Sequence, residues 1–355
     1  MSQSLIFITG ATGFIGSHVA LQALEAGYKL RVSVRKEAQI DTLRSIFSSY
    51  ADQIDFVVIP DLSKPGAFAS ALQDVAHVFH VASPMPGKGD DFEQGYLQPA
   101  VKGTTTLLDT AQGFSTIKRV VIVSSVLSLM PMGAVGATEP IIAKGKCPFP
   151  LRKPPINTPK EGLNPSLPVD PKMSFPDDPQ TAAGLKYHAS KILAHRATLE
   201  WAATHKPSFN IISLHPSFVF GRSLTQTSAG ALDGSNGLLW AGLTGPRAGV
   251  PMVAVDVRDV AAAHIKALTV AVDSKDKVTE FILSASEREG WTWGGVAQFA
   301  KEKYAAVGVQ VEAPYPPQHR LETTRAETLL GIKWRAMQDT VSAFLEQQLE
   351  LQVKL

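Results

Sequence analysis

Apolar segments of strand length alternate with longer helix-like segments through the first half of the chain. LIFIT at 5–9 precedes FIGSHVALQALEAG at 14–27, and four further apolar runs follow: LRVSV, DFVVI, HVFHV and RVVIVSS. This alternation is typical of βαβ units, in which helices cover both faces of a parallel sheet. The pattern predicts an α/β fold built on a Rossmann-type, doubly wound parallel sheet.

The second half of the chain follows a more mixed pattern. A helix is predicted over about 182–205, where Pro207 ends it, and the strand-like FNIISL comes next. Beyond about 221 the sequence predicts a helix after DVRDV, a strand at EFILSA, and helices near 292–305 and 338–351. We therefore expect a main domain over 1–220 and, over 221–355, mostly a smaller and discontinuous mixed α/β lobe.

The segment 131–180 interrupts this pattern, because it holds twelve of the 24 prolines of the chain. Proline fixes one backbone dihedral and lacks the N–H donor, so this density excludes a long helix or a central strand. The segment is therefore expected to be either an ordered cover or a tether without fixed structure.

The overall composition favours small-molecule partners. The chain has 355 residues, 45% of them hydrophobic and 19% charged, with a formal net charge of +2. Without a dense basic cluster there is no electrostatic reason to expect nucleic acid or a membrane surface. The longest apolar stretch, at 120–137, is broken by serine, proline and glycine, which excludes a membrane span.

Cysteine usage and the two ends of the chain favour the cytoplasm. Cys147 is the only cysteine, so no disulfide framework or thiolate metal site is expected, and no His, Asp, Glu or Cys spacing suggests a metal. MSQSLIFITG lacks the features of a secretory signal. The final Val353, Lys354 and Leu355 only partly match a peroxisomal SKL tail, because valine replaces the serine.

A glycine-rich turn links the first strand to the first helix. TGATGFIGSHVA places Gly10, Gly13 and Gly16 there, around Thr12 and the apolar pair of Phe14 and Ile15. Glycines at these positions allow a tight turn, close approach of backbone N–H groups to a pyrophosphate, and close helix packing. Because the turn follows a strand and opens a helix, it predicts a dinucleotide site.

The residues after the second and third strands indicate which dinucleotide binds. The second strand ends at Arg35 and Lys36, where an NAD-binding protein would offer a carboxylate to the ribose, whereas cationic side chains accept the extra phosphate of NADP(H). The pair favours NADPH, although both residues would also suit an exposed helix start beside Glu37. Asp61 and Leu62 are expected near the adenine, and Asp61 could equally be a turn residue.

Two further polar groups suggest proton chemistry. Ser124 and Ser125 end a buried strand, where ligands of open α/β sheets bind, and serine there either holds a substrate oxygen or caps the backbone. Tyr187 and Lys191 are four residues apart and share one helix face, so the ammonium could lower the pKa of the phenol. The same spacing also occurs on solvated helix faces.

Taken together, these motifs resemble the extended short-chain dehydrogenases/reductases of the NAD-dependent epimerase/dehydratase superfamily, and especially the dihydroflavonol 4-reductase-like ketone and aldehyde reductases of fungi and plants. The resemblance rests on TGATGFIG, HVASP, the strand-end SS, YHASK, HPSFVFG and DVRDVAAAH. It implies that Ser125 is the catalytic serine, Tyr187 the proton donor, and Lys191 the residue that holds the nicotinamide ribose. It also implies cofactor contacts from Ala82, Ser83, Ser124, Pro216 and Ser217.

The resemblance implies an NADPH-dependent carbonyl reductase that transfers hydride to a ketone or aldehyde. It suggests a polyketide-type intermediate of fungal secondary metabolism as the substrate. A nucleotide-sugar epimerase or dehydratase and a non-catalytic NADP-binding sensor are the alternatives. The resemblance leaves the oligomeric state open between monomer and homodimer. Other polar residues are expected to be structural: His188 and His195 as exposed or satisfied helix residues, His80 beneath the cofactor, and Asp259 at a helix start.

Overall fold

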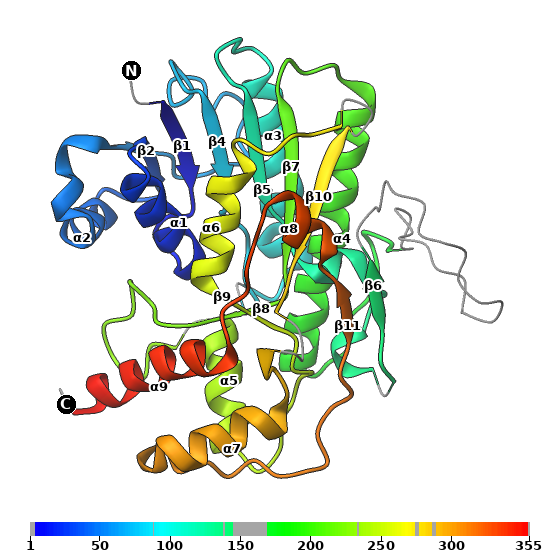
Figure 1. Ribbon diagram of the computed structural model, residues 1–355. Helices are drawn as coiled ribbons and strands as arrows, with labels where there is room; N and C mark the ends of the chain where they lie inside the picture. The colour runs from blue at the N-terminus through cyan, green and yellow to red at the C-terminus, as the bar shows by residue number, and fades with distance from the viewer. Residues whose placement is uncertain are drawn as a thin grey trace.

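The computed structural model describes residues 4–87, 89–137, 139–144, 169–232, 234–273, 277–285 and 289–353. Seven parallel strands form the central sheet in the order β10-β7-β5-β4-β1-β2-β3 (Figure 1). These strands are β1 (Leu5–Thr9), β2 (Lys29–Val34), β3 (Ile54–Val58), β4 (His77–His80), β5 (Arg119–Val123), β7 (Asn210–Pro216) and β10 (Val278–Leu283). The predicted doubly wound parallel sheet is confirmed.

Helices cover both faces of this sheet. Ile6 and Ile8 of β1 point into a core shared with α1 (Phe14–Glu25), α2 (Ala38–Ile46) and α6 (Val257–Ala267). Phe7, between them, points the opposite way, toward α3 (Gly103–Ala111) and the end of α4 (Pro179–Thr204). Successive side chains of a strand alternate between faces, so an uninterrupted apolar run such as LIFIT supplies both cores.

A third core lies beyond the sheet, at the bottom of the view in Figure 1. It is formed by α5 (Gly234–Thr244), α7 (Trp293–Lys303) and α9 (Met337–Val353), with the short parallel strands β8 (Phe218–Phe220) and β9 (Ala254–Asp256) beside them. Trp293 packs so closely on Gly242 that a Cβ there would overlap its ring. These helices make up most of the smaller lobe expected from the sequence.

The strand at EFILSA lies elsewhere than expected. We expected it in the C-terminal lobe, but β10 forms the edge of the central sheet, paired in parallel with β7 from Val278↔Ile211 to Leu283↔Pro216. The helix α8 (Thr324–Leu329) contacts β10. A six-residue strand buried at every position is most stable beside another strand under a helix, and the parallel sheet provides that environment.

Shorter elements complete the chain. They are the 3-10 helices at Ser48–Gln53, Val126–Leu129, Ala134–Gly136 and Ala305–Val307, a π-helix at Glu93–Lys102, and the strands β6 (Ile142–Lys144) and β11 (Arg320–Glu322). Among helices within the described ranges, none is long and apolar enough to cross a membrane.

The proline-rich segment is described only at its two ends, 131–137 with 139–144, and 169–180. Its first part is attached to the C-terminal lobe, because β6 pairs in parallel with β11. His319 strengthens this attachment: its Nδ1 accepts a hydrogen bond from the Ile141 backbone at 3.2 Å, and its Nε2 lies 2.9 Å from the Ala134 carbonyl oxygen. The question of cover or tether concerns 145–168, which lie outside the described residues, as does Cys147.

Candidate active site

The glycine-rich turn at the end of β1 leaves no room for side chains. Gly10 has a φ of +80°, and a Cβ there would lie 2.6 Å from the backbone nitrogen of Ala82. A Cβ on Gly16 would overlap the carbonyl oxygen of Gly10. Gly13 closes the turn by donating a hydrogen bond from its N–H to that same carbonyl at 3.1 Å. The chain therefore requires glycine at 10 and 16, which is the property expected of a cradle for a pyrophosphate.

The first turn of α1 presents free backbone donors toward this cradle. Gly13 is the N-cap, no side chain caps the helix, and no acidic residue lies in its first turn. The first N–H groups of a helix lack partners within it, and the helix dipole favours an anion at that end. Thr12, Phe14 and Ile15 belong to this turn and its first helical residues. The surroundings fit a dinucleotide phosphate without further rearrangement.

Thr9 and His80 fix the neighbouring strand end. The Ala82 N–H donates to Thr9 Oγ1 at 3.2 Å, and the same hydroxyl lies 2.9 Å from His80 Nδ1. Burial lowers the pKa of His80 to about 4, so the ring is neutral and can accept the hydroxyl proton. This arrangement holds 81–83 against the glycine-rich turn, and Ala82 and Ser83 line a small cavity with Lys191 and Ser124. His80 is buried as expected, whereas Thr9 was not singled out from the sequence.

Arg35 and Lys36 lie at the carboxyl end of β2, and both are exposed. Their backbone N–H groups donate to one side-chain oxygen, Oε1 of Gln39, at 3.0 and 3.2 Å. Gln39 therefore holds the turn while the two cationic side chains extend into solvent. Glu37 is the N-cap residue of α2, so Arg35 and Lys36 lie directly before a helix. This position fits both interpretations of the pair, as phosphate ligands and as an exposed helix start.

Asp61 adopts the turn role that the sequence allowed. It accepts hydrogen bonds from the Ser63 backbone at 2.9 Å and from the Ser63 hydroxyl at 2.6 Å, and these bonds lower the pKa of its carboxyl group. Leu62 is partly buried and packs against the core on the α3 face. The contact of these residues with an adenine stays a prediction.

The fold brings together the three residues to which proton chemistry was assigned. Ser125 follows β5 and caps a 3-10 helix, its Oγ accepting from the Leu127 N–H at 3.2 Å. Its side chain also lies close enough to the hydroxyl of Tyr187 on α4 to act on the pKa of that phenol. Lys191, one turn further along α4, donates to the Ser124 carbonyl oxygen at 3.4 Å, and its Nζ lies 5.5 Å from the centre of the Tyr187 ring. Sixty residues of chain separate partners that meet in one site.

Burial controls the pKa values of Tyr187 and Lys191. Burial raises the pKa of Tyr187 to about 12, although the hydrogen bond from Ser125 acts in the opposite direction. Burial also lowers the pKa of Lys191 to about 8. The sequence predicted that Lys191 would lower the pKa of Tyr187, whereas the net shift is upward and burial is its largest cause. Burial disfavours the charged phenolate.

The end of β7 supplies the other predicted cofactor residues. Pro216 is its last residue, and Ser217 donates its hydroxyl proton to Ser284 Oγ at 2.9 Å while its N–H bonds the Leu283 carbonyl. Ser217 is buried. The two residues lie at the carboxyl end of β7, at the edge where Gly10, Ala82 and Ser124 follow their own strands. A shared location at the carboxyl ends of parallel strands is where ligands of such sheets bind.

The residues expected to be structural have partners in the fold, so each histidine is paired rather than exposed. His188 is buried and lies 3.1 Å from the Met130 carbonyl oxygen through Nε2, and His195 is buried in an ion pair with Glu280. Asp259 forms an ion pair with Arg335 in the first turn of α6, whose N-cap is Asp256. The sequence did not reveal these partners, because each lies far along the chain from the residue that it contacts.

Comparisons with known proteins agree with this geometry. Residues 6–149 match the model of the NAD dependent epimerase/dehydratase family. The chain is 36% identical over 360 residues to ketoreductase sphI of Aspergillus fumigatus, covering 99% of each chain. It is 29% identical to ketoreductase CTB6 of Cercospora beticola, covering 100% of this chain and 97% of that one.

Solved structures support the fold. Yeast methylglyoxal/isovaleraldehyde reductase Gre2, solved with NADPH, superposes with a TM-score of 0.77 at 23% identity, covering 99% of this chain and 100% of that one. Vestitone reductase from alfalfa gives a TM-score of 0.73 at 21% identity, with the same coverage. With a relative 36% identical along its whole length and a site of this geometry, the chain belongs to the NAD-dependent epimerase/dehydratase family.

Proposed function

We propose that the protein is an NADPH-dependent carbonyl reductase acting on a ketone or an aldehyde. The observation that carries this proposal is the meeting of Ser125, Tyr187 and Lys191 at the edge of the sheet that also bears the glycine-rich turn. The names of the relatives support it, since those similar along their whole length are ketoreductases.

The hydroxyls of Ser125 and Tyr187 have different roles at the substrate carbonyl. Ser125 donates a hydrogen bond to the carbonyl oxygen and stabilises the negative charge that develops there. A pKa of about 12 keeps Tyr187 protonated at neutral pH, so it is in the form needed to protonate that oxygen. NADPH, when bound, supplies the hydride that reduces the carbonyl carbon. Lys191 binds the nicotinamide ribose and favours the phenolate that remains after proton transfer.

The residues that would hold the cofactor follow from the same geometry. The cradle at Gly10 and Gly16 and the uncapped start of α1 would receive the pyrophosphate. Arg35 and Lys36, exposed on the turn that Gln39 holds, would bind the additional phosphate that distinguishes NADPH from NADH. Ala82, Ser83, Ser124, Pro216 and Ser217 would line the remainder of the nicotinamide half.

The proposal extends to the substrate pocket, the compartment, the oligomeric state and the substrate class. The lobe formed mostly by 221–355 would shape the substrate pocket over the domain at 1–220. We place the enzyme in the cytoplasm, acting as a monomer or homodimer on a polyketide-type carbonyl compound of secondary metabolism. Support for the substrate class comes from the fungal ketoreductases among its relatives.

The test is NADPH oxidation, followed at the absorbance of the reduced nicotinamide, against a panel of ketones and aldehydes, with NADH as the control. Tyr187→Phe should lower kcat by at least about a hundredfold while NADPH still binds, because the ring remains and the acid is removed. Near-normal turnover of that variant, or no oxidation of NADPH by wild type with any carbonyl compound, would reject the proposal.

A further inference from the structure

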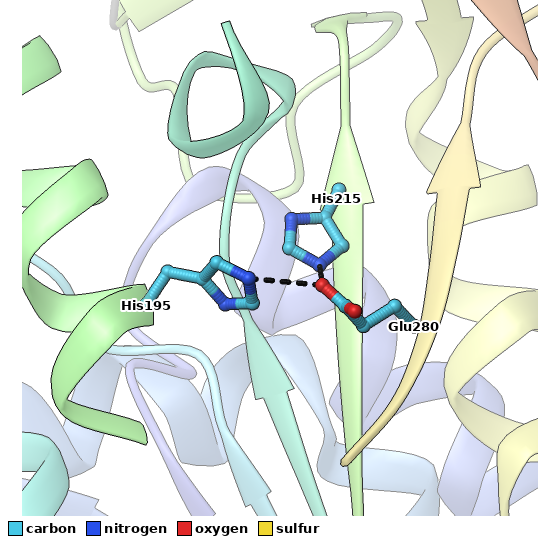
Figure 2. Close-up of side chains that lie close together, drawn as sticks. All are labelled: His195, His215 and Glu280. Atoms are coloured by element: carbon cyan, nitrogen blue, oxygen red, sulfur yellow. Dashed lines mark ion pairs between the residues drawn. The ribbon is translucent and has the colours of Figure 1, made fainter. Parts of the chain in front are cut away.

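Three buried side chains from distant parts of the chain converge behind the site. His195 comes from α4, His215 from β7 and Glu280 from β10, and Figure 2 shows both imidazole rings directed at one oxygen of the carboxylate. Oε1 of Glu280 lies 2.9 Å from His195 Nε2 and 3.5 Å from His215 Nε2. The three side chains are 7%, 0% and 5% exposed, so they meet away from bulk water.

The sheet register explains why they meet. Ser213, paired in register with Glu280, and His215 both lie on the face of β7 that α4 covers, since the alternate residues Ile212 and Leu214 belong to the opposite core. Glu280 lies on the same face of β10, because its neighbour Phe281 also belongs to that opposite core. The polar face of β7 and of the edge strand β10 is therefore closed by a helix that carries a third polar side chain.

The hydrogen bonds of His215 establish its tautomer. Its Nδ1 lies 3.2 Å from the Ser125 carbonyl oxygen, which can only accept. It also lies 3.0 Å from Ser128 Oγ, whose own proton is donated to the same carbonyl at 2.7 Å. Both partners of Nδ1 are therefore acceptors, and Nδ1 carries the ring proton. In the neutral ring, Nε2 then bears a lone pair.

That lone pair faces a second acceptor. His215 Nε2 is buried without a hydrogen-bond partner among the described residues, and it lies 3.5 Å from a carboxylate oxygen of Glu280. Two buried acceptors directed at each other cost free energy unless a proton or a cation lies between them. A proton there would require a charged imidazolium, whereas a cation would satisfy both lone pairs at once.

We propose that His195, His215 and Glu280 form a binding site for one divalent transition-metal ion, zinc being the best match. Two imidazoles and a carboxylate are a donor set that zinc accepts with bonds of about 2.0–2.2 Å, so tetrahedral ligands lie about 3.4 Å apart. The three donor atoms all lie within 4.8 Å of one another, and two of the separations are 2.9 and 3.5 Å. Small side-chain rotations therefore suffice.

The surroundings supply the other parts of such a site. Ser128 and the Ser125 carbonyl orient His215 from behind, as hydrogen-bond partners commonly orient metal-binding histidines. His195 and Ser213 line the small cavity that also borders Lys191, and water from it can provide a fourth ligand. An ion here would join α4, β7 and the edge strand β10. This function is separate from carbonyl reduction.

Zinc binding is measured by equilibrium dialysis and elemental analysis of the folded chain, in a Cys147→Ser background so that the single thiol cannot hold the ion. We expect about one zinc per chain. Cobalt(II), used as a spectroscopic probe of the same protein, should give the intense visible bands of a four-coordinate ion. Absence of bound zinc, or only the weak bands of six-coordinate cobalt, would overturn the proposal.

Variants locate the ion. Glu280→Gln and His215→Gln should each weaken zinc binding by at least about tenfold. His264→Gln is the matched control, because His264 is also 0% exposed, and its Nε2 also lacks a partner among the described residues, but it packs against Phe79 away from Glu280. Equal zinc affinity in all three variants would place the ion elsewhere and overturn the proposal.

One further measurement does not depend on the variants folding. In wild type labelled with ¹⁵N-histidine, the Nε2 signal of His215 should be that of an unprotonated nitrogen and should move when zinc is added. If that nitrogen is protonated and unaffected by zinc, a proton bridges His215 and Glu280, and the metal site is refuted.

Discussion

Lys191 is expected to lower the free energy of unfolding of the protein at neutral pH. The residue is only 5% exposed, and burial lowers its pKa from 10.5 to about 8. Below pH 8 the folded protein must bury an ammonium group, whereas the unfolded chain keeps the same group in water. Lys191→Met retains most of the side-chain volume and removes the charge, so the variant should be more stable than wild type at pH 7, although it should lose activity.

The expected gain follows from the two pKa values. The difference of about 2.5 pH units between 10.5 and about 8 corresponds to about 3.5 kcal/mol at about 1.4 kcal/mol per unit. Loss of the hydrogen bond from Nζ to the Ser124 carbonyl, 3.4 Å long, offsets about 1 kcal/mol of this gain. The net increase in the free energy of unfolding at pH 7 is therefore about 2.5 kcal/mol.

The pH dependence has a definite sign. Between the folded pKa of about 8 and the unfolded value of 10.5, the unfolded chain binds more protons, so the stability of wild type rises with pH in this window. The difference in the free energy of unfolding between Lys191→Met and wild type should therefore decrease by about 2 kcal/mol between pH 7 and about pH 9.5. Tyr187, with its pKa raised from 10.0 to about 12, acts in the opposite direction above pH 10, so the measurement stops below that value.

The assay is urea unfolding of both proteins without cofactor, followed by circular dichroism at several pH values in this window. Lys301→Met, on α7, is the control, because Lys301 is exposed and its removal relieves no buried charge. A Lys191→Met variant less stable than wild type at pH 7, or a stability difference that does not change with pH, would refute the reasoning.

Three further outcomes are expected. Arg35→Ala should raise the KM for NADPH by about ten- to a hundredfold and change that for NADH little, measured by initial rates, since a lost charged contact is worth about 1.5–3 kcal/mol; a wild type that prefers NADH would contradict this. Gly16→Ala should abolish NADPH binding in a fluorescence titration, because its Cβ would overlap the Gly10 carbonyl oxygen, and unaltered affinity would count against the cradle. Ser125→Ala should lower kcat with little change in NADPH affinity, since the Ser125 hydroxyl is placed on the substrate oxygen; an equal loss of cofactor affinity would place it on the cofactor instead.

Local patterns were enough to predict the fold. Strand-length apolar runs alternating with helical segments indicate a parallel sheet covered on both faces, and all six such runs of the first half lie where expected in β1 to β5 and α1. The lobe assignment of β10 was harder, because a short apolar strand has the same pattern in either location. Only the available partner strand, β7, decided it.

The spacing of residues also located much of the candidate site. Gly10 is required by its positive φ and Gly16 by a backbone contact within the same turn, and Tyr187 and Lys191 share a helix face at i and i+4. Both features can therefore be predicted from neighbours in the chain. Carboxyl ends of parallel strands meet at one edge, which made the position of Ser125 predictable as well.

What the sequence by itself determined about this protein is therefore its sheet, its glycine-rich cradle and the face that carries Tyr187 and Lys191, because each depends on residues close together in the chain. Only the tertiary structure decided the degree of burial, and with it the raised pKa of Tyr187 and the lowered pKa of Lys191. It alone also brought His195, His215 and Glu280 together. Desolvation and such long-range contacts arise from packing of distant segments, which no local spacing records.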